Sequence, residues 1–191
     1  PAFDPATRTL YYAAWTDDSL GAVWSRAIDG GGAARKLTTF PSQYGSLTLS
    51  PDGRSLALLR GAADLVRGQT LEGQGRFDLI LIGPDGVERR VTAVDWGEGQ
   101  YANFATKHSP GITFSPDGSE LYFTEMLADT LHVKRIRTDG VEEKTLYQLP
   151  HSGRAVVSPA RWPAFGTRGE RWPVSRSSRG SASSTMSCLR L

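Results

Sequence analysis

The sequence predicts an all-β protein made of repeated four-stranded antiparallel sheets, and two recurring turns carry this prediction. The first is a Ser-Pro-Asp-Gly turn at 50–53 and 115–118, with a looser copy at 4–7, and each copy runs into an apolar strand. Ser, Pro and Gly at these places are typical of a type I turn, because Pro presets φ and Gly closes the turn. The second is an Asp-Gly pair at 29–30, 85–86 and 139–140.

Each Asp-Gly pair lies between two strand-like runs, as expected of a hairpin. Apolar-rich runs precede the pairs at 22–28, 79–82 and 131–136, and shorter runs follow them at 35–38, 89–92 and 144–147. The glycine supplies the positive φ that a tight hairpin turn needs. Each unit therefore contains four antiparallel strands, with the first turn after its first strand and the Asp-Gly turn after its third.

The spacing of the units predicts propeller blades. The prolines that anchor the first turn, Pro5, Pro51, Pro116 and Pro159, are 46, 65 and 43 residues apart. A four-stranded unit with a period in the forties is typical of a β-propeller blade. We expect a partial β-propeller over 1–166, with blades at about 1–40, 43–95 and 110–150 and an incomplete fourth at 154–166.

The repeat also resembles a known family. Its Ser-Pro-Asp-Gly-x-x-Leu-x-Phe/Leu pattern, followed by an apolar strand and an Asp-Gly hairpin, is similar to the WD40-like repeat of TolB-type β-propellers from residue 1 to about 158. The stretches 10–18, 68–70 and 121–125 are most similar to the amino-terminal propellers of bacterial amidohydrolases. The resemblance implies a six-bladed ring, of which about three and a half blades are predicted here, and a periplasmic or exported protein. We expect the true amino terminus, with any export signal, to lie upstream of Pro1.

The repeat pattern is lost near the end of the chain. Arg161 replaces the turn glycine of the fourth copy, and Pro163 lies where its strand should continue. Residues 167–191 contain seven Ser and five Arg without a strand or helix period. Two interpretations remain open for this segment: a natural disordered tail, or the product of a shifted reading frame.

Composition excludes several classes of protein. The net charge is +2, and the five Arg and one Glu of 167–191 leave 17 basic and 19 acidic residues before them. Such a balance predicts no nucleic-acid partner. No apolar run approaches the roughly 18 residues of a membrane span, and the single cysteine, Cys188, has no partner for an internal disulfide.

The sequence predicts no catalytic residue, metal site or cofactor in this segment. The histidines, His108, His132 and His151, lack metal-ligand spacing, and no Gly-x-Ser-x-Gly motif is present. Glu125 is predicted to be a solvated strand end; the alternative is a carboxylate that pairs with a base from another blade. A set of strand aromatics is predicted to pack inside the blades: Tyr11, Tyr12, Trp15, Trp24, Tyr122 and Phe123.

Blade two contains two insertions of about ten residues, within 61–76 and 95–109. The distance from Pro51 to Asp85 is 34 residues, against 24 and 23 in the other units, and Asp85 to Pro116 is 31, against 22 and 20. Connections after the second and fourth strands leave an antiparallel sheet at the same edge, and enlarged loops on one face of a scaffold often carry recognition. The candidate binding residues there are Arg67, Gln69, Glu72, Trp96, Tyr101 and His108. The alternative is that these loops contact neighbouring blades or a fused domain.

Three functions are compatible with these observations. The first is a non-catalytic propeller module of a larger bacterial metal-dependent amidohydrolase, with a fused carboxyl-terminal catalytic domain as its partner. The second is a free TolB-like periplasmic propeller that binds a protein. The third is the gating propeller of a prolyl-oligopeptidase-type serine peptidase.

Overall fold

The computed structural model describes residues 1–29, 32–63, 76–95, 111–127 and 130–150, and these residues form three four-stranded antiparallel sheets. Within each sheet the strands are ordered as in the sequence. Blade one comprises β1 (Ala2–Asp4), β2 (Thr9–Thr16), β3 (Leu20–Ala27) and β4 (Arg35–Lys36). Blade two comprises β5 (Ser42–Leu49), β6 (Leu56–Ala63), β7 (Arg76–Ile82) and β8 (Glu88–Asp95). Blade three comprises β9 (Ile112–Phe114), β10 (Glu120–Leu127), β11 (Thr130–Arg137) and β12 (Lys144–Pro150).

The Ser-Pro-Asp-Gly turns connect the first and second strands of blades two and three, as predicted. In blade three the Gly118 amide donates a hydrogen bond to the Ser115 carbonyl at 2.9 Å, and Gly118 has a φ of +74°. The Ser115 hydroxyl donates to Asp117 Oδ1 at 2.6 Å and accepts from the Glu120 amide at 2.9 Å. The serine therefore joins the turn to the strand that follows it.

The Asp-Gly turns of blades two and three use the same geometry. The Gly86 amide donates to the Gly83 carbonyl, and the Gly140 amide donates to the Arg137 carbonyl, each at 2.9 Å. Both glycines have positive φ, +75° and +87°. Residues with a Cβ atom rarely adopt this backbone conformation, so the sequence specifies these two turns through single glycines.

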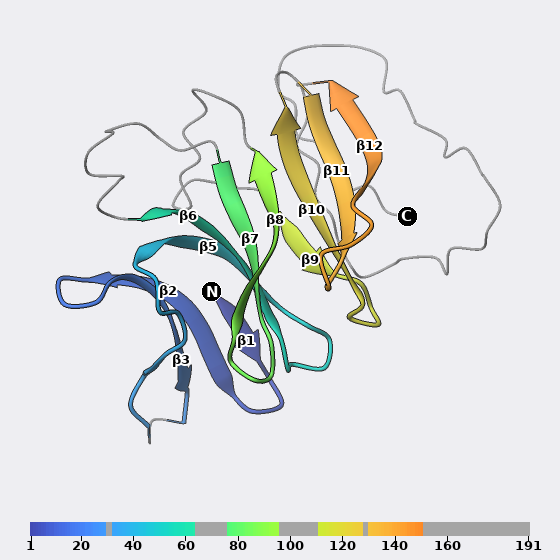
Figure 1. Cartoon of the computed structure of the whole chain (residues 1–191). Helices are drawn as coiled ribbons and strands as arrows, with labels where there is room; N and C mark the ends of the chain where they lie inside the picture. Colours follow the sequence, from blue (N-terminus) through green and yellow to red (C-terminus); the bar gives the residue numbers. More distant parts are fainter. Residues whose placement is uncertain (30–31, 64–75, 96–110, 128–129, 151–191) are drawn as a thin grey trace, which may run out of the picture.

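Blade two lies between the other two blades and is buried on both faces (Figure 1). Successive side chains of a strand point to opposite faces of the sheet. Leu56 and Leu58 of β6 therefore pack in one apolar cluster with Val23 of blade one, whereas Ala57 and Leu59 pack in a second cluster with Phe123 of blade three. These two clusters form the core of the described residues.

The first strands of the blades lie on the inside of the arrangement. Strand β5 contacts β1 on one side and β9 on the other, while the last strands β4, β8 and β12 form the outer edge of each sheet. This is the order of strands in a propeller, from the inside to the rim. A helix long and apolar enough to cross a membrane is not found among the described residues.

One prediction about the strand aromatics is wrong. Tyr122 and Phe123 are buried, but the side chain of Trp15 is 53% exposed. Trp15 pairs with Gly21, one residue pair from the end of the β2–β3 hairpin. Because glycine offers no side chain to pack against, the indole ring extends past the apolar cluster into solvent.

Candidate functional site

The two insertions of blade two begin at the same edge of the sheet. Ala63, the last residue of β6, pairs with Ser42, and Arg76, the first residue of β7, pairs with Asp95, the last residue of β8. Arg76 and Asp95 also form an ion pair at 3.5 Å. We call the edge formed by Ala63, Arg76 and Asp95 the loop edge. The Ser-Pro-Asp-Gly and Asp-Gly turns lie at the opposite end of the strands (Figure 1).

The six predicted binding residues all lie outside the described part of the chain, in 64–75 and 96–110. They are Arg67, Gln69, Glu72, Trp96, Tyr101 and His108, and their assignment to a binding face stays a prediction. The structure does describe the strand ends from which these segments leave, and the charged side chains on both sides of those ends. These flanking residues form the candidate site that can be described.

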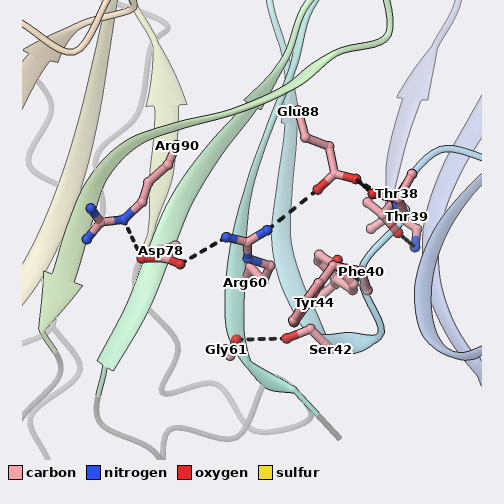
Figure 2. Close-up of polar contacts among 11 residues, drawn as sticks. Thr38, Thr39, Phe40, Ser42, Tyr44, Arg60, Gly61, Asp78, Glu88 and Arg90 are labelled. Atoms are coloured by element: carbon pink, nitrogen blue, oxygen red, sulfur yellow. Dashed lines mark hydrogen bonds and ion pairs between the residues drawn. The ribbon is translucent and has the colours of Figure 1, made fainter.

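An ion-pair network on the side of blade one extends from near the loop edge toward the Asp-Gly turn (Figure 2). Asp78 of β7 lies between two arginines: Arg60 Nη2 is 3.1 Å from its Oδ2, and Arg90 Nε is 2.6 Å from its Oδ1. Arg60 also reaches Glu88, with 3.7 Å between Nη1 and Oε2. Two arginines and two carboxylates therefore neutralise one another across three adjacent strands.

The same network holds the connection between blades one and two. Glu88 Oε1 accepts hydrogen bonds from the Thr39 amide at 2.7 Å and from its hydroxyl at 3.1 Å. The Arg60 guanidinium lies over the Phe40 ring, 5.5 Å from its centroid, and the Tyr44 hydroxyl donates to the Phe40 carbonyl at 2.5 Å. Burial raises the pKa of Tyr44, so the phenol remains a donor at neutral pH.

A second network flanks the loop edge on the side of blade three. The buried carboxylate of Glu125 in β10 accepts a hydrogen bond from the Asp95 amide at 3.0 Å, which links blade three to the end of β8. Lys134 Nζ lies 2.5 Å from Glu125 Oε2 and 2.8 Å from Glu143 Oε1. Burial lowers the pKa of Lys134, but the two carboxylates outweigh burial and leave this pKa raised.

The prediction that Glu125 is a solvated strand end is therefore wrong. Its strand neighbours Thr124 and Met126 are buried as well, so the strand continues into the protein rather than ending in solvent. The repeat contained a signal for this position. Glu125 lies nine residues after Pro116, as Arg60 lies nine residues after Pro51, and both strands contain apolar or aromatic residues, at 56–58 and 121–123.

The turns at the opposite edge form a shallow hollow of about 370 Å³, lined by residues that include Ser50, Asp52, Pro116 and Asp117. Hydrogen bonds from Ser115 and Ser119 lower the pKa of Asp117 to about 2, and hydrogen bonds from Ser50 and the Arg54 amide lower that of Asp52. These carboxylates are ionised and bound within their own turns. They are therefore parts of the fold rather than free acids or bases.

The three histidines of the chain were considered above as possible metal ligands. His132 lies in β11 as a partly buried strand residue, whereas His108 and His151 fall outside the described residues. Among the residues that the structure describes, no three His, Cys, Asp or Glu side chains gather closely enough to hold a metal ion.

Comparison with known proteins identifies the fold. Neither the protein-family models nor the curated proteins include a match. Among solved structures, the chain is similar to TolB from Acinetobacter baumannii, with 18% identity and a TM-score of 0.54, over 76% of this chain and 31% of that one. It is also similar to a protein assigned as a TolB from Agrobacterium tumefaciens, with 21% identity and a TM-score of 0.52, over 78% of this chain and 48% of that one. The chain thus spans less than half of either protein, and it has the fold of a TolB-like β-propeller.

Proposed function

We propose that this chain is a propeller module that supports a recognition surface in a larger bacterial metal-dependent amidohydrolase and carries no catalytic group itself. The observation that carries the proposal is the common origin of the two insertions at the loop edge, where Arg76 pairs with Asp95. Loops that leave a rigid scaffold side by side can form one continuous contact surface. The scaffold beneath them is fixed by blade two, which is packed on both faces.

The chemistry of the described residues near the loop edge supports a scaffold rather than a reaction centre. Asp78 is held between two arginines, and Glu125 is held by Lys134 and the Asp95 amide. A general base needs a carboxylate or imidazole that can take up a substrate proton. These two carboxylates are already bound to cations or to a backbone amide, so they suit the role of fixing strand ends.

The association with an amidohydrolase rests on the resemblance of 10–18, 68–70 and 121–125 to the propellers of such enzymes. Reading the gene beyond the codon for Ser158 in all three frames tests it. A barrel sequence with a His-x-His strand end supports the amidohydrolase, because two such histidines are suited to binding a catalytic metal. A Gly-x-Ser-x-Gly segment would instead indicate a serine peptidase.

A test on the full-length protein addresses the recognition surface directly. We expect Arg67→Ala and Tyr101→Ala to weaken substrate or partner binding by roughly tenfold, as loss of a contact residue at an interface does, with thermal stability nearly unchanged. Val87→Ala is the matched control, because Val87 is exposed and follows the Asp-Gly turn at the opposite edge. Binding that is weakened equally by Val87→Ala, or unaffected by the two loop variants, would contradict the proposal.

A free TolB-like propeller that binds a protein is the second candidate. The fold similarity to two TolB structures favours it. A natural stop codon soon after Ser158, or soon after further propeller repeats, would support this candidate over the amidohydrolase. The variants Arg67→Ala and Tyr101→Ala also test this candidate, and the measured quantity is then the affinity for the protein partner.

A further inference from the structure

Four turns of the described residues contain an Asp-Gly bond: 50–53, 83–86, 115–118 and 137–140. Three of them begin with a side chain that binds the aspartate two residues later, at 2.5 to 2.6 Å: Ser50 with Asp52, Ser115 with Asp117, and Arg137 with Asp139. The turn at 83–86 begins with Gly83, which has no side chain to offer. Within the described part of the chain, the Asp85 carboxylate accepts one hydrogen bond, from the Val87 amide at 3.1 Å.

The turn at 83–86 is also closed less tightly than the other three. The amide of the first residue donates to a carbonyl one or two residues beyond the glycine, and this N···O distance is 2.9 Å for 50–53 and 115–118 and 3.1 Å for 137–140. For 83–86 the distance is 3.4 Å, beyond the usual limit of about 3.2 Å. A Cβ atom on Gly83 would lie 2.9 Å from Asp85 Oδ1. The carboxylate therefore occupies the space next to residue 83 that a side chain would need.

The glycine of this turn is the least covered of the four. A Cβ atom placed on each of the other three would lie 3.2 to 3.6 Å from an atom of the preceding blade: Gly53 from Asp4, Gly118 from Pro51, and Gly140 from the Val91 carbonyl. Gly86 is exposed, and the corresponding distance is 3.8 Å, to the end of the flexible Arg35 side chain. Neighbouring blades therefore hold three of the turns in place and leave the turn at 83–86 open to water.

We propose that Asp85 is the residue among these four aspartates that converts spontaneously to isoaspartate. Asp-Gly bonds are prone to this reaction because glycine has no Cβ atom to shield its nitrogen. The Gly86 nitrogen attacks Cγ of Asp85, and the new N–Cγ bond closes a five-membered succinimide ring. One carboxyl oxygen leaves as water, with the amide proton and one proton from solvent. This modification is independent of the proposed function, because it needs no partner or substrate.

Hydrolysis completes the conversion without an oxidant or reductant. Water adds to the main-chain carbonyl of the succinimide and breaks its bond to the Gly86 nitrogen, so that the main chain continues through Cγ of Asp85. The new α-carboxylate returns the proton to solvent, and the mass of the protein is unchanged. In the other three turns the carboxylate must first leave the side chain that binds it, and the packed glycine must move away from its neighbouring blade. Both requirements slow ring closure.

Ageing the folded 191-residue chain at neutral pH, in water labelled with a heavy oxygen isotope, tests the proposal. Each succinimide that hydrolyses takes up one labelled oxygen, which peptide mass spectrometry locates, and methylation by a protein isoaspartate methyltransferase identifies the isoaspartate. We expect Asp85 to react roughly tenfold faster or more than the other three aspartates, since each of them loses a hydrogen bond to a charged group. In guanidinium chloride the four rates should be similar, because the same dipeptide is then free of its turn.

Two variants test the cause. Gly83→Ser places a serine where Ser115 stands in blade three, and it should slow the reaction of Asp85 to the rate of Asp117. Asp85→Glu should remove the label from this peptide, because glutamate would have to close a six-membered ring.

Three results would overturn the proposal. The first is no label at Asp85 in the folded chain after a time in which the denatured chain has reacted. The second is a folded-state rate at Asp52, Asp117 or Asp139 that equals or exceeds that of Asp85. The third is a folded Gly83→Ser variant that reacts as fast as the unmodified chain. If Gly83→Ser does not fold, the comparison of the four bonds within the unmodified chain still decides.

Discussion

Arg60 and Glu125 show how one repeat position is used in two ways. Each lies nine residues after its turn proline, at the loop end of the face that meets the preceding blade. Arg60 pairs with Asp78 and covers Phe40, and Glu125 pairs with Lys134 and accepts the Asp95 amide. At this position the apolar contact between blades gives way to charged contacts that connect one blade to the next.

The pair of Lys134 and Glu125 provides a prediction at this scale. Their side chains are 15% and 7% exposed, so Lys134→Met leaves a carboxylate in a largely dry site without its cation. We expect a loss of about 3–5 kcal/mol in the free energy of unfolding, measured by urea denaturation. Arg8→Met, which breaks the exposed pair with Asp29, should cost less than about 1 kcal/mol. Equal losses for both variants would contradict this account.

Asp117 provides a prediction about pH. Its pKa in the folded protein is about 2, below the ordinary value of 3.8, because Ser115 and Ser119 donate hydrogen bonds to the ionised form. A lowered pKa adds stability above pH 4, and this gain is lost as the pH falls from about 4 to about 2. We expect Asp117→Asn to lower the free energy of unfolding at pH 7 by at most about 1 kcal/mol, since solvent screens this exposed carboxylate.

Urea denaturation between pH 7 and pH 2 measures this effect. The loss of stability between pH 4 and pH 2 should be smaller in Asp117→Asn than in the unmodified chain, because the variant has no such carboxylate to protonate. Asp17→Asn, in the exposed β2–β3 hairpin of blade one, is the control. An unchanged pH dependence in Asp117→Asn would mean that the turn does not stabilise the ionised form.

Strand β6 shows how one element stabilises two interfaces at once. Leu58 and Leu59 are adjacent and both fully buried, but Leu58 faces blade one and Leu59 faces blade three. Each substitution to Ala should cost about 2–5 kcal/mol in the free energy of unfolding, through lost contacts and a new cavity. The two variants differ in which interface loses packing: Leu58→Ala affects the contact with blade one, and Leu59→Ala affects the contact with blade three.

Hydrogen exchange can separate these two effects. Leu58→Ala should accelerate amide exchange most in β3, and Leu59→Ala most in β10, because each cavity opens toward a different blade. Leu146→Ala, at a partly buried position in the outer strand β12, is a control whose cost should be smaller. Identical exchange patterns for Leu58→Ala and Leu59→Ala would indicate that the three blades open as one unit.

The elements themselves were predictable because their signals are local. Four-residue turns with a glycine at positive φ, such as Gly53 and Gly118, specify where each strand begins. The cross-strand partners are harder to predict, because β-bulges shift the register between Leu79 and Ile80 and within β5. Bulges leave little trace in the sequence, so the partners of Asp78 and Arg90 could not be predicted from spacing alone.

At the scale of the whole molecule, the order and packing of the blades follow from the period of the repeat, but the contacts between blades do not. The Arg89 side chain donates to the Thr138 carbonyl at 2.9 Å, and the Thr92 hydroxyl donates to Glu143 at 2.8 Å. These contacts join residues about fifty positions apart. These contacts depend on how two folded sheets pack against each other. A single sequence carries no local signal for the relative position of two sheets.

The strand order within each sheet has a consequence for how the protein is made. Each of the three sheets in the described part of the chain is formed from one continuous stretch, with β1 to β4, β5 to β8 and β9 to β12 as successive neighbours. None of the strands in these three described sheets must wait for a distant segment before it can pair, so each of the three blades can fold soon after it leaves the ribosome. Each new blade then finds an apolar sheet already formed on which to pack.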